Sequence, residues 1–246
     1  MFDKQTILDY LWSYSHFYSY CLSQSEELYR SKNGFSAITV LFSCLENISK
    51  SAINDYESNL FNVFKKLFDT GLITRAEYDF LNTGESCIRK IRNLYAHANI
   101  TAINLVENQN DKEILYPLSE DETSLLLYAR ISDIVYNLII KLASCSFIED
   151  LKQKFCISLD EPITKCHIKI KKLSVEELLI LKGYPPNYIS DELEIPEDTK
   201  YRMVDNIPDA NVYTFILSEI KSDFPLKLKS ETDTAITLKE IEEEIT

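Results

Sequence analysis

The chain has 246 residues, of which 45% are hydrophobic, with only four glycines and seven prolines. This length and composition predict one principal domain with a sizeable core and a smaller appendage, built mainly from long regular elements. A net charge of −13 argues against a protein that holds nucleic acid through its overall charge, so phosphate attraction would require a local basic patch. The scattered cysteines, the absence of a signal pattern and the lack of a long apolar run predict a cytoplasmic protein without a membrane span.

Apolar residues recur at helical spacing through most of the first 150 residues. The pattern predicts helices over residues 5–30, 35–50 with an extension to 67 left open, a short stretch after Thr74, 85–99 and 119–147. Asn33-Gly34 separates the first two helices, and Thr74 with Glu77 forms a capping box. We expect the polar residues 107–113 to form a loop.

The residue pattern changes in the last part of the chain. Five of the seven prolines lie in the final quarter of the sequence. Residues 163–173 alternate as a strand does, Ser174 starts a short helix, and residues 212–217 read as another strand. We therefore expect a mainly α fold, with a helical bundle over residues 1–150 and a small α+β region over residues 151–246.

One short helix concentrates basic and titratable side chains. Its polar residues include Arg89, Lys90, Arg92, Asn93 and His97. An ideal helix turns by about 100° per residue. One stripe of its surface therefore contains Arg89, Asn93 and His97, and Arg92 lies beside that stripe. A plain amphipathic helix with a solvated basic face is the alternative interpretation of this segment.

The residue types of this helix match the needs of RNA cleavage without metal. Such cleavage requires an acid, a base and a cation that stabilises charge on phosphorus. His97 can serve as acid or base near neutral pH, and Arg92 can bind phosphate through two hydrogen bonds. Asn93 can orient the imidazole or donate to the phosphate. Because one histidine per chain cannot fill both proton-transfer roles, a two-fold dimer would supply the second.

Several further residues are candidates for support of this site. Arg89 and Lys90 extend the basic patch as substrate-binding candidates. Tyr95 can stack on a base or pack in the core. Glu46 either pairs with an arginine of the basic helix or occupies an ordinary exposed position. We expect no metal and no cofactor.

The metal expectation depends on a cysteine and a histidine that are adjacent in sequence, with a further cysteine ten residues before them. Cys156, Cys166 and His167 lack the paired spacing of a zinc site. The lysines around Cys166 and His167, which are Lys165, Lys169, Lys171 and Lys172, are interpreted as the solvated face of a strand, with contact to an RNA backbone as the alternative.

The run Arg-Asn-Leu-Tyr-Ala-His, residues 92–97, resembles the signature of the HEPN superfamily, in which an arginine is followed by four to six residues and a histidine. The resemblance covers about residues 1–150. It implies an all-α bundle in which Arg92, Asn93 and His97 are catalytic. Many HEPN proteins are dimeric, metal-independent ribonucleases of defence and toxin–antitoxin systems. Asn99 stands where HEPN toxins paired with nucleotidyltransferase antitoxins often have tyrosine, so control by nucleotidylation is not implied.

The resemblance therefore predicts a metal-independent endoribonuclease that acts in prokaryotic stress response or in defence against phage or plasmids. Its active site would lie at a homodimer interface, and its substrate would be RNA, such as tRNA or mRNA. A regulatory protein or antitoxin is an expected partner. The alternative is a non-catalytic HEPN module that dimerises or binds a protein.

Overall fold

The computed structural model describes residues 1–97, 100–109, 112–147, 157–189, 195–207 and 210. The chain divides into two compact units, of which the first is Met1–Lys171 and the second begins at Lys172. This division comes after the expected boundary at residue 150. The reason is that apolar side chains between Ile157 and Ile170 pack against the core of the helical unit.

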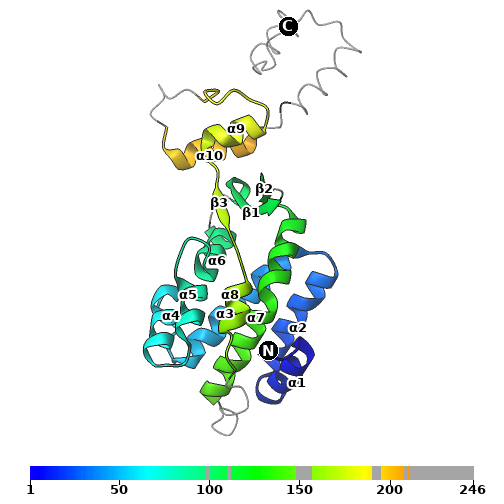
Figure 1. Ribbon diagram of the computed structural model, residues 1–246, viewed down its shortest axis with the longest axis vertical. Helices are drawn as coiled ribbons and strands as arrows, with labels where there is room; N and C mark the ends of the chain where they lie inside the picture. Colours follow the sequence, from blue (N-terminus) through cyan, green and yellow to red (C-terminus); the bar gives the residue numbers. More distant parts are fainter. Residues whose placement is uncertain (98–99, 110–111, 148–156, 190–194, 208–209, 211–246) are drawn as a thin grey trace, which may run out of the picture. The chain divides into compact units, whose positions relative to one another are not determined.

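The first unit is a bundle of helices with a small sheet (Figure 1). Its helices are α1 (Lys4–Tyr14), α2 (His16–Arg30), α3 (Gly34–Ala52), α4 (Leu60–Asp69), α5 (Arg75–Asn82), α6 (Ile88–His97), α7 (Asp121–Phe147) and α8 (Asp160–Lys165). A 3₁₀ turn, Ile100–Ala102, precedes the sheet. The predicted mainly α fold is confirmed for the described part of the chain.

One predicted helix is broken in two, and the extension of another, which the pattern leaves open, is absent. The predicted helix over residues 5–30 is interrupted at Ser15, whose extended backbone allows its side chain to cap α2. No helix runs through to residue 67, because Asn54 has a positive φ of 51° and Asn59 caps α4 as a new helix. Apolar spacing continues across both breaks, so periodicity alone does not reveal them.

The core is built where α3 packs along α7, helices of 19 and 27 residues. At Gly34 the backbones approach so closely that a Cβ atom would lie 2.2 Å from Asp121 O and 2.8 Å from Leu125 N. Phe35 N donates to Asp121 Oδ1 at 2.8 Å, so the residue that begins α7 also caps α3. Fully buried side chains of these two helices include Ile38, Leu41, Ile48, Leu127, Ile131, Val135 and Leu138.

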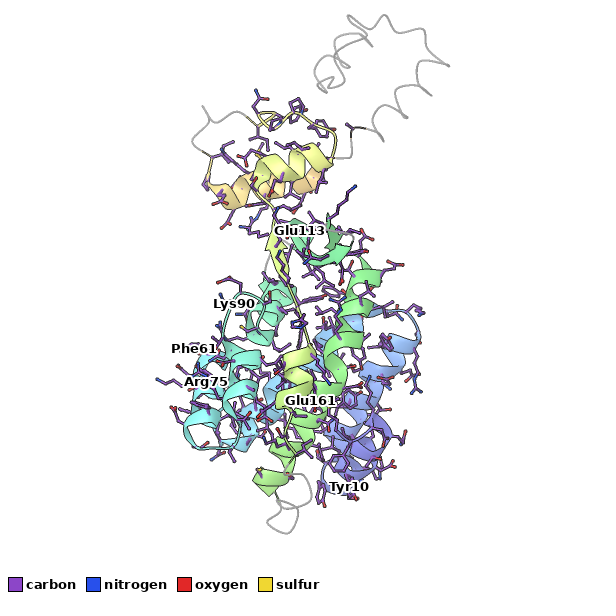
Figure 2. The ribbon with its side chains drawn as sticks, in the orientation of Figure 1. Tyr10, Phe61, Arg75, Lys90, Glu113 and Glu161 are labelled. Atoms are coloured by element: carbon purple, nitrogen blue, oxygen red, sulfur yellow. The ribbon has the colours of Figure 1, made fainter. Side chains whose placement is uncertain are left out.

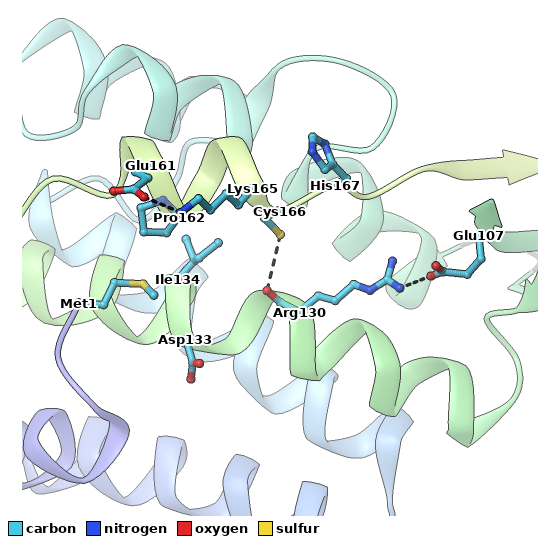
Figure 3. Close-up of a pocket in the computed structure, with 10 residues that line it drawn as sticks. All are labelled: Met1, Glu107, Arg130, Asp133, Ile134, Glu161, Pro162, Lys165, Cys166 and His167. Carbon is cyan, nitrogen blue, oxygen red and sulfur yellow. Dashed lines mark hydrogen bonds and ion pairs between the residues drawn. The ribbon is translucent and has the colours of Figure 1, made fainter. Parts of the chain in front are cut away.

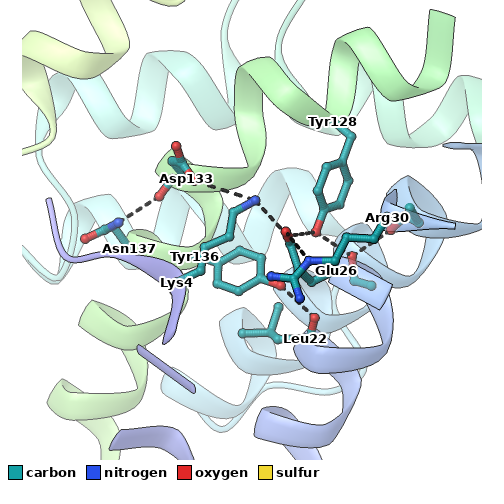
Figure 4. Close-up of polar contacts among 10 residues, drawn as sticks. Lys4, Leu22, Glu26, Arg30, Tyr128, Asp133, Tyr136 and Asn137 are labelled. Carbon is teal, nitrogen blue, oxygen red and sulfur yellow. Dashed lines mark hydrogen bonds and ion pairs between the residues drawn. The ribbon is translucent and has the colours of Figure 1, made fainter. Parts of the chain in front are cut away.

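A polar network connects α1 and α2 with α7 (Figure 4). Lys4 Nζ lies 2.8 Å from Glu26 Oε2, and the Tyr128 hydroxyl donates to the same oxygen at 3.1 Å. The Tyr136 hydroxyl donates to Leu22 O at 2.6 Å. Burial raises the pKa of both tyrosines, so their hydroxyls remain protonated donors at neutral pH.

The sheet contains three strands in the order β2-β1-β3. These are β1 (Ile103–Gln109), β2 (Lys112–Pro117) and β3 (Ile170–Lys172), with β1 and β2 antiparallel from Asn104 opposite Pro117 to Gln109 opposite Lys112. The predicted loop over residues 107–113 is wrong in its described part, which belongs to β1 and β2. Its polar residues suit a strand because Glu107 pairs with Arg130 and Glu113 with Lys169.

The predicted strand over residues 163–173 is also largely wrong. Its first residues lie in α8, which begins with Asp160 and Glu161, acidic side chains that favour a helix N-terminus. Only β3 is a strand within this segment. Alternation of apolar and polar residues does not distinguish a short helix followed by extended chain from a continuous strand.

The second unit contains α9 (Val175–Leu181) and α10 (Glu197–Asn206) in its described part. The helix predicted after Ser174 is confirmed as α9, with a capping box formed by Ser174 and Glu177. Lys182 Nζ donates to the carbonyls of Val204 and Ile207 at 2.7 Å, at the C-terminal end of α10. The predicted strand over residues 212–217 lies outside the described residues.

No helix in the described ranges combines the length and the apolar character that a bilayer crossing requires.

We expect Gly34→Ala to lower the free energy of unfolding by about 1–3 kcal/mol or more, because the added methyl group would collide with backbone atoms of α7 that cannot rotate away. Urea unfolding followed by circular dichroism measures the loss. Ser36→Ala, at an exposed position two residues further along α3, is the matched control, with an expected change within about 0.5 kcal/mol. Equal stability of the two variants would contradict the close approach.

Candidate functional site

Helix α6 presents one apolar face and one polar face. Ile88 and Ile91 are buried in the core, while Asn93 is exposed and Arg89 and Arg92 are partly exposed. The hydroxyl of Ser86, just before the helix, accepts a hydrogen bond from Ile170 N at 3.1 Å. These contacts fix the helix so that its polar face lies beside α3 and α4.

Arg92 is anchored to α3 by a carboxylate that it shares with a lysine. Arg92 Nη2 donates to Glu46 Oε2 at 2.6 Å, and Lys50 Nζ lies 2.9 Å from Glu46 Oε1. The exposed fractions of the Arg92, Glu46 and Lys50 side chains are 28%, 18% and 19%, so the cluster is only partly hydrated. One negative and two positive charges leave a net charge of +1 at this position. Of the two interpretations of Glu46, the structure places it in a pair with Arg92.

The two other proposed catalytic residues follow Arg92 on the same helix. Asn93 is exposed, and its Oδ1 accepts a hydrogen bond from Arg92 Nη1 at 3.3 Å. His97 is the last residue of α6, one turn beyond Asn93. The proposed phosphate-binding residue, Arg92, and the proposed proton carrier, His97, therefore lie on one continuous helix. The side chain of His97 lies outside the described part of the structure.

Arg89 is held by a buried asparagine rather than by a carboxylate. Arg89 Nε donates to Asn82 Oδ1 at 2.6 Å, and Asn82 Nδ2 donates to Phe61 O at 3.2 Å. The guanidinium carbon of Arg89 lies 5.4 Å from the centre of the Phe61 ring, a cation–π arrangement. Asn82 is only 4% exposed, so this contact between α4 and α6 is fixed from the inside.

These residues line one pocket of about 490 Å³. Its lining consists of Glu46, Asn59, Leu60, Phe61, Arg89, Arg92 and Asn93. Four of the seven candidates named from the sequence therefore meet at one place, although they come from α3 and α6. The pocket offers two guanidinium groups, side-chain amides and one aromatic ring to a ligand.

Lys90 and Tyr95 lie outside this pocket. Lys90 Nζ pairs with Glu85 Oε1 at 2.6 Å on the surface. The Tyr95 ring packs against Phe35 and Phe42, and its hydroxyl lies 2.8 Å from Ser124 Oγ. Of the two interpretations of Tyr95, the structure places the ring among the core residues.

A second, larger cavity of about 720 Å³ lies between α7 and the segment that contains α8 (Figure 3). Cys166 and His167 are in its wall, together with Arg130, which pairs with Glu107. Cys166 Sγ contacts Arg130 O at 3.5 Å, and burial raises the pKa of this thiol. In the described residues, no three histidine, cysteine, aspartate or glutamate side chains are grouped to hold a metal ion. Cys156 lies outside the described residues.

Sequence reasoning missed Asn59, Phe61, Asn82 and Lys50. Phe61 carries the clearest overlooked signal, because it falls outside the apolar stripe of α4 formed by Leu60, Val63, Phe64 and Leu67, and is 45% exposed. An aromatic residue on the polar side of an amphipathic helix is a candidate contact residue. Asn82 and Lys50 have no comparable sequence signal.

Comparison with known protein families, curated proteins and solved structures finds no significant match for this chain.

The buried position of Tyr95 predicts a pH dependence. Burial raises the pKa of Tyr95 from 10.0 to about 12, with the Ser124 contact acting in the opposite direction. Between these values the folded protein keeps a proton that the unfolded chain releases, so the stability present below pH 10 is lost as the pH rises toward 12.

Tyr95→Phe should therefore lose less stability over this pH range than the wild type, because its ring carries no ionisable group. Urea unfolding at a series of alkaline pH values measures how the free energy of unfolding of each protein changes with pH. The free energy of unfolding of each protein at neutral pH is the reference for that change. The same pH dependence in both proteins would contradict a buried Tyr95 hydroxyl.

Proposed function

We propose that this protein is a metal-independent endoribonuclease of HEPN type that acts as a homodimer in prokaryotic stress response or in defence against phage or plasmids. The observation that carries the proposal is the meeting of Arg89, Arg92 and Asn93 in one pocket on the helix that ends at His97. The HEPN-like spacing of Arg92 and His97 supports the same assignment.

The proposed reaction is attack of a ribose 2′-hydroxyl on the adjacent phosphorus. The oxygen–phosphorus bond to the 2′-oxygen forms, and the bond to the 5′-oxygen breaks. One His97 takes the proton of the 2′-hydroxyl, and His97 of a second copy gives a proton to the departing 5′-oxygen. Arg92 stabilises the negative charge on the phosphate oxygens, and Asn93 orients the phosphate or the imidazole. The products carry a 2′,3′-cyclic phosphate and a free 5′-hydroxyl.

The acidic composition is compatible with this proposal because the pocket itself is cationic. Glu46 neutralises one of the two cations, Arg92 and Lys50, and Arg89 adds a further positive charge. Phosphate binding depends on the charges at the contact surface, and the net charge of the chain mainly slows the approach of RNA.

We expect purified wild-type protein to cleave total RNA or tRNA in excess EDTA, and His97→Ala and Arg92→Ala to reduce the rate about 100-fold or more. Denaturing gels measure the rate, and end analysis of the products identifies the cyclic phosphate. Arg75→Ala is the matched control, because Arg75 is an exposed arginine paired with Asp79 away from the pocket. Full activity of His97→Ala would place the catalytic site elsewhere.

Glu46→Gln tests the role of the carboxylate beside Arg92. The change removes a negative charge 2.6 Å from the guanidinium, so RNA should bind several-fold more tightly. Fluorescence anisotropy with the non-cleaving His97→Ala protein, with and without Glu46→Gln, measures this effect. Glu57→Gln, an acidic residue outside the pocket lining, is the control for the loss of one charge. Weaker binding by Glu46→Gln would show that holding Arg92 in place outweighs the repulsion.

The second candidate function is a non-catalytic module that dimerises or binds a protein partner. It is favoured by exposed aromatic side chains on α1 and α2. Trp12, Phe17 and Tyr20 are each more than half exposed, and the Trp12 ring stacks on His16 with ring centres 3.9 Å apart. Exposed aromatic residues are typical of protein interfaces. No RNA cleavage by the wild-type dimer would favour this function over the ribonuclease.

A further inference from the structure

The rim of the pocket beside Arg92 has a construction that phosphate binding alone does not require. Phosphate recognition needs cations and hydrogen-bond donors, which Arg92 and Asn93 provide. The lining also includes an exposed phenylalanine, Phe61, with the Arg89 guanidinium over its ring. An exposed aromatic ring in the wall of a polar pocket offers a face on which a ligand with an apolar face can stack.

We infer that Phe61 and Arg89 form a subsite for a nucleobase of single-stranded RNA, next to the phosphate held by Arg92. The inference rests on the proposed ribonuclease function and assigns the substrate class of the same site. Every base has an aromatic face that stacks on phenylalanine or on the plane of a guanidinium group. In a duplex these faces are covered by the neighbouring bases, so the subsite selects unpaired nucleotides.

The subsite is held in place before any ligand binds. The buried amide of Asn82 accepts a hydrogen bond from Arg89 and donates one to the backbone of Phe61. A second contact, from Arg89 Nη2 to Asn82 O at 3.4 Å, restrains the guanidinium further. Fixing a long arginine side chain in advance reduces the entropy that binding would otherwise cost.

The size and the polar groups of the pocket suit a nucleotide. Its volume of about 490 Å³ is within the range of about 300–1,000 Å³ that is usual for small-ligand sites. Asn59 uses its Oδ1 to cap α4, accepting from Asn62 N at 3.0 Å, so its amide nitrogen is the group that can donate to a base edge. Figure 2 shows Phe61 and Lys90 on the same side of the helical unit, where α4 and α6 lie.

The test is binding of a fluorescein-labelled single-stranded RNA oligonucleotide, measured by anisotropy with the His97→Ala protein as the non-cleaving background. Phe61→Leu should weaken binding about tenfold, the loss expected for one stacked base, and Phe61→Trp should restore it. Tyr56→Leu is the control, because Tyr56 is an exposed aromatic residue outside the pocket lining. The same RNA annealed to its complement should bind more weakly and respond little to Phe61→Leu.

A direct readout comes from the tryptophan content of the chain, which has a single tryptophan, Trp12. In the variant Trp12→Phe/Phe61→Trp the only indole lies in the pocket, and stacking of a base should quench its fluorescence. Denaturant unfolding of each variant confirms that the exposed substitutions leave the fold intact.

The outcomes separate this inference from the ribonuclease proposal. If Arg92→Ala weakens RNA binding while Phe61→Leu does not, the base subsite is wrong and the ribonuclease proposal stands. Equal effects of Phe61→Leu on single-stranded and duplex RNA would also overturn the subsite. If wild-type protein neither binds nor cleaves RNA, both the subsite and the proposed function are wrong.

Discussion

The contact of α3 with α7 at Gly34 is the constraint on which the candidate site depends. It fixes α3 along the longest helix of the bundle, and Asp121 joins the starts of the two helices by a hydrogen bond. Glu46 and Lys50 lie further along the same α3 helix, so their positions follow from that packing. The pair between Glu46 and Arg92 then connects the polar face of α6 to α3. A change in the apolar core therefore reaches the pocket through one rigid helix.

The electrostatics of the site reflect a compromise between folding and binding. A partly buried arginine without a partner is costly, and Glu46 removes that cost for Arg92 in the free protein. A phosphate group that enters the pocket offers Arg92 a second anionic partner and meets Glu46 at close range. Arg89 is different, because a neutral amide holds it and its full charge remains available. The two arginines are thus prepared for contact with an anion in different ways.

The sequence predicts the helical architecture and the helix that carries the site, because helical periodicity and basic residue types are local signals. Arg89, Arg92 and Asn93 were identified in this way, and they share a pocket. The hairpin of β1 and β2 was not predicted, since its strands carry polar side chains whose ion-pair partners are distant in sequence. Phe61 and Asn82 were also missed, because their importance comes from a contact between three helices that spacing along one helix cannot reveal.

The buried amide of Asn82 links Phe61 and Arg89, two positions of the pocket, through its hydrogen bonds. It binds the arginine of α6 and the backbone of α4 from its own place at the end of α5, so Phe61 and Arg89 are not independent groups. Replacing Asn82 would remove a hydrogen-bond partner from both Arg89 and the Phe61 carbonyl, and residues that share a partner in this way have interaction energies that do not add. We therefore expect the effects of substitutions at Asn82 and Arg89 to be coupled rather than additive.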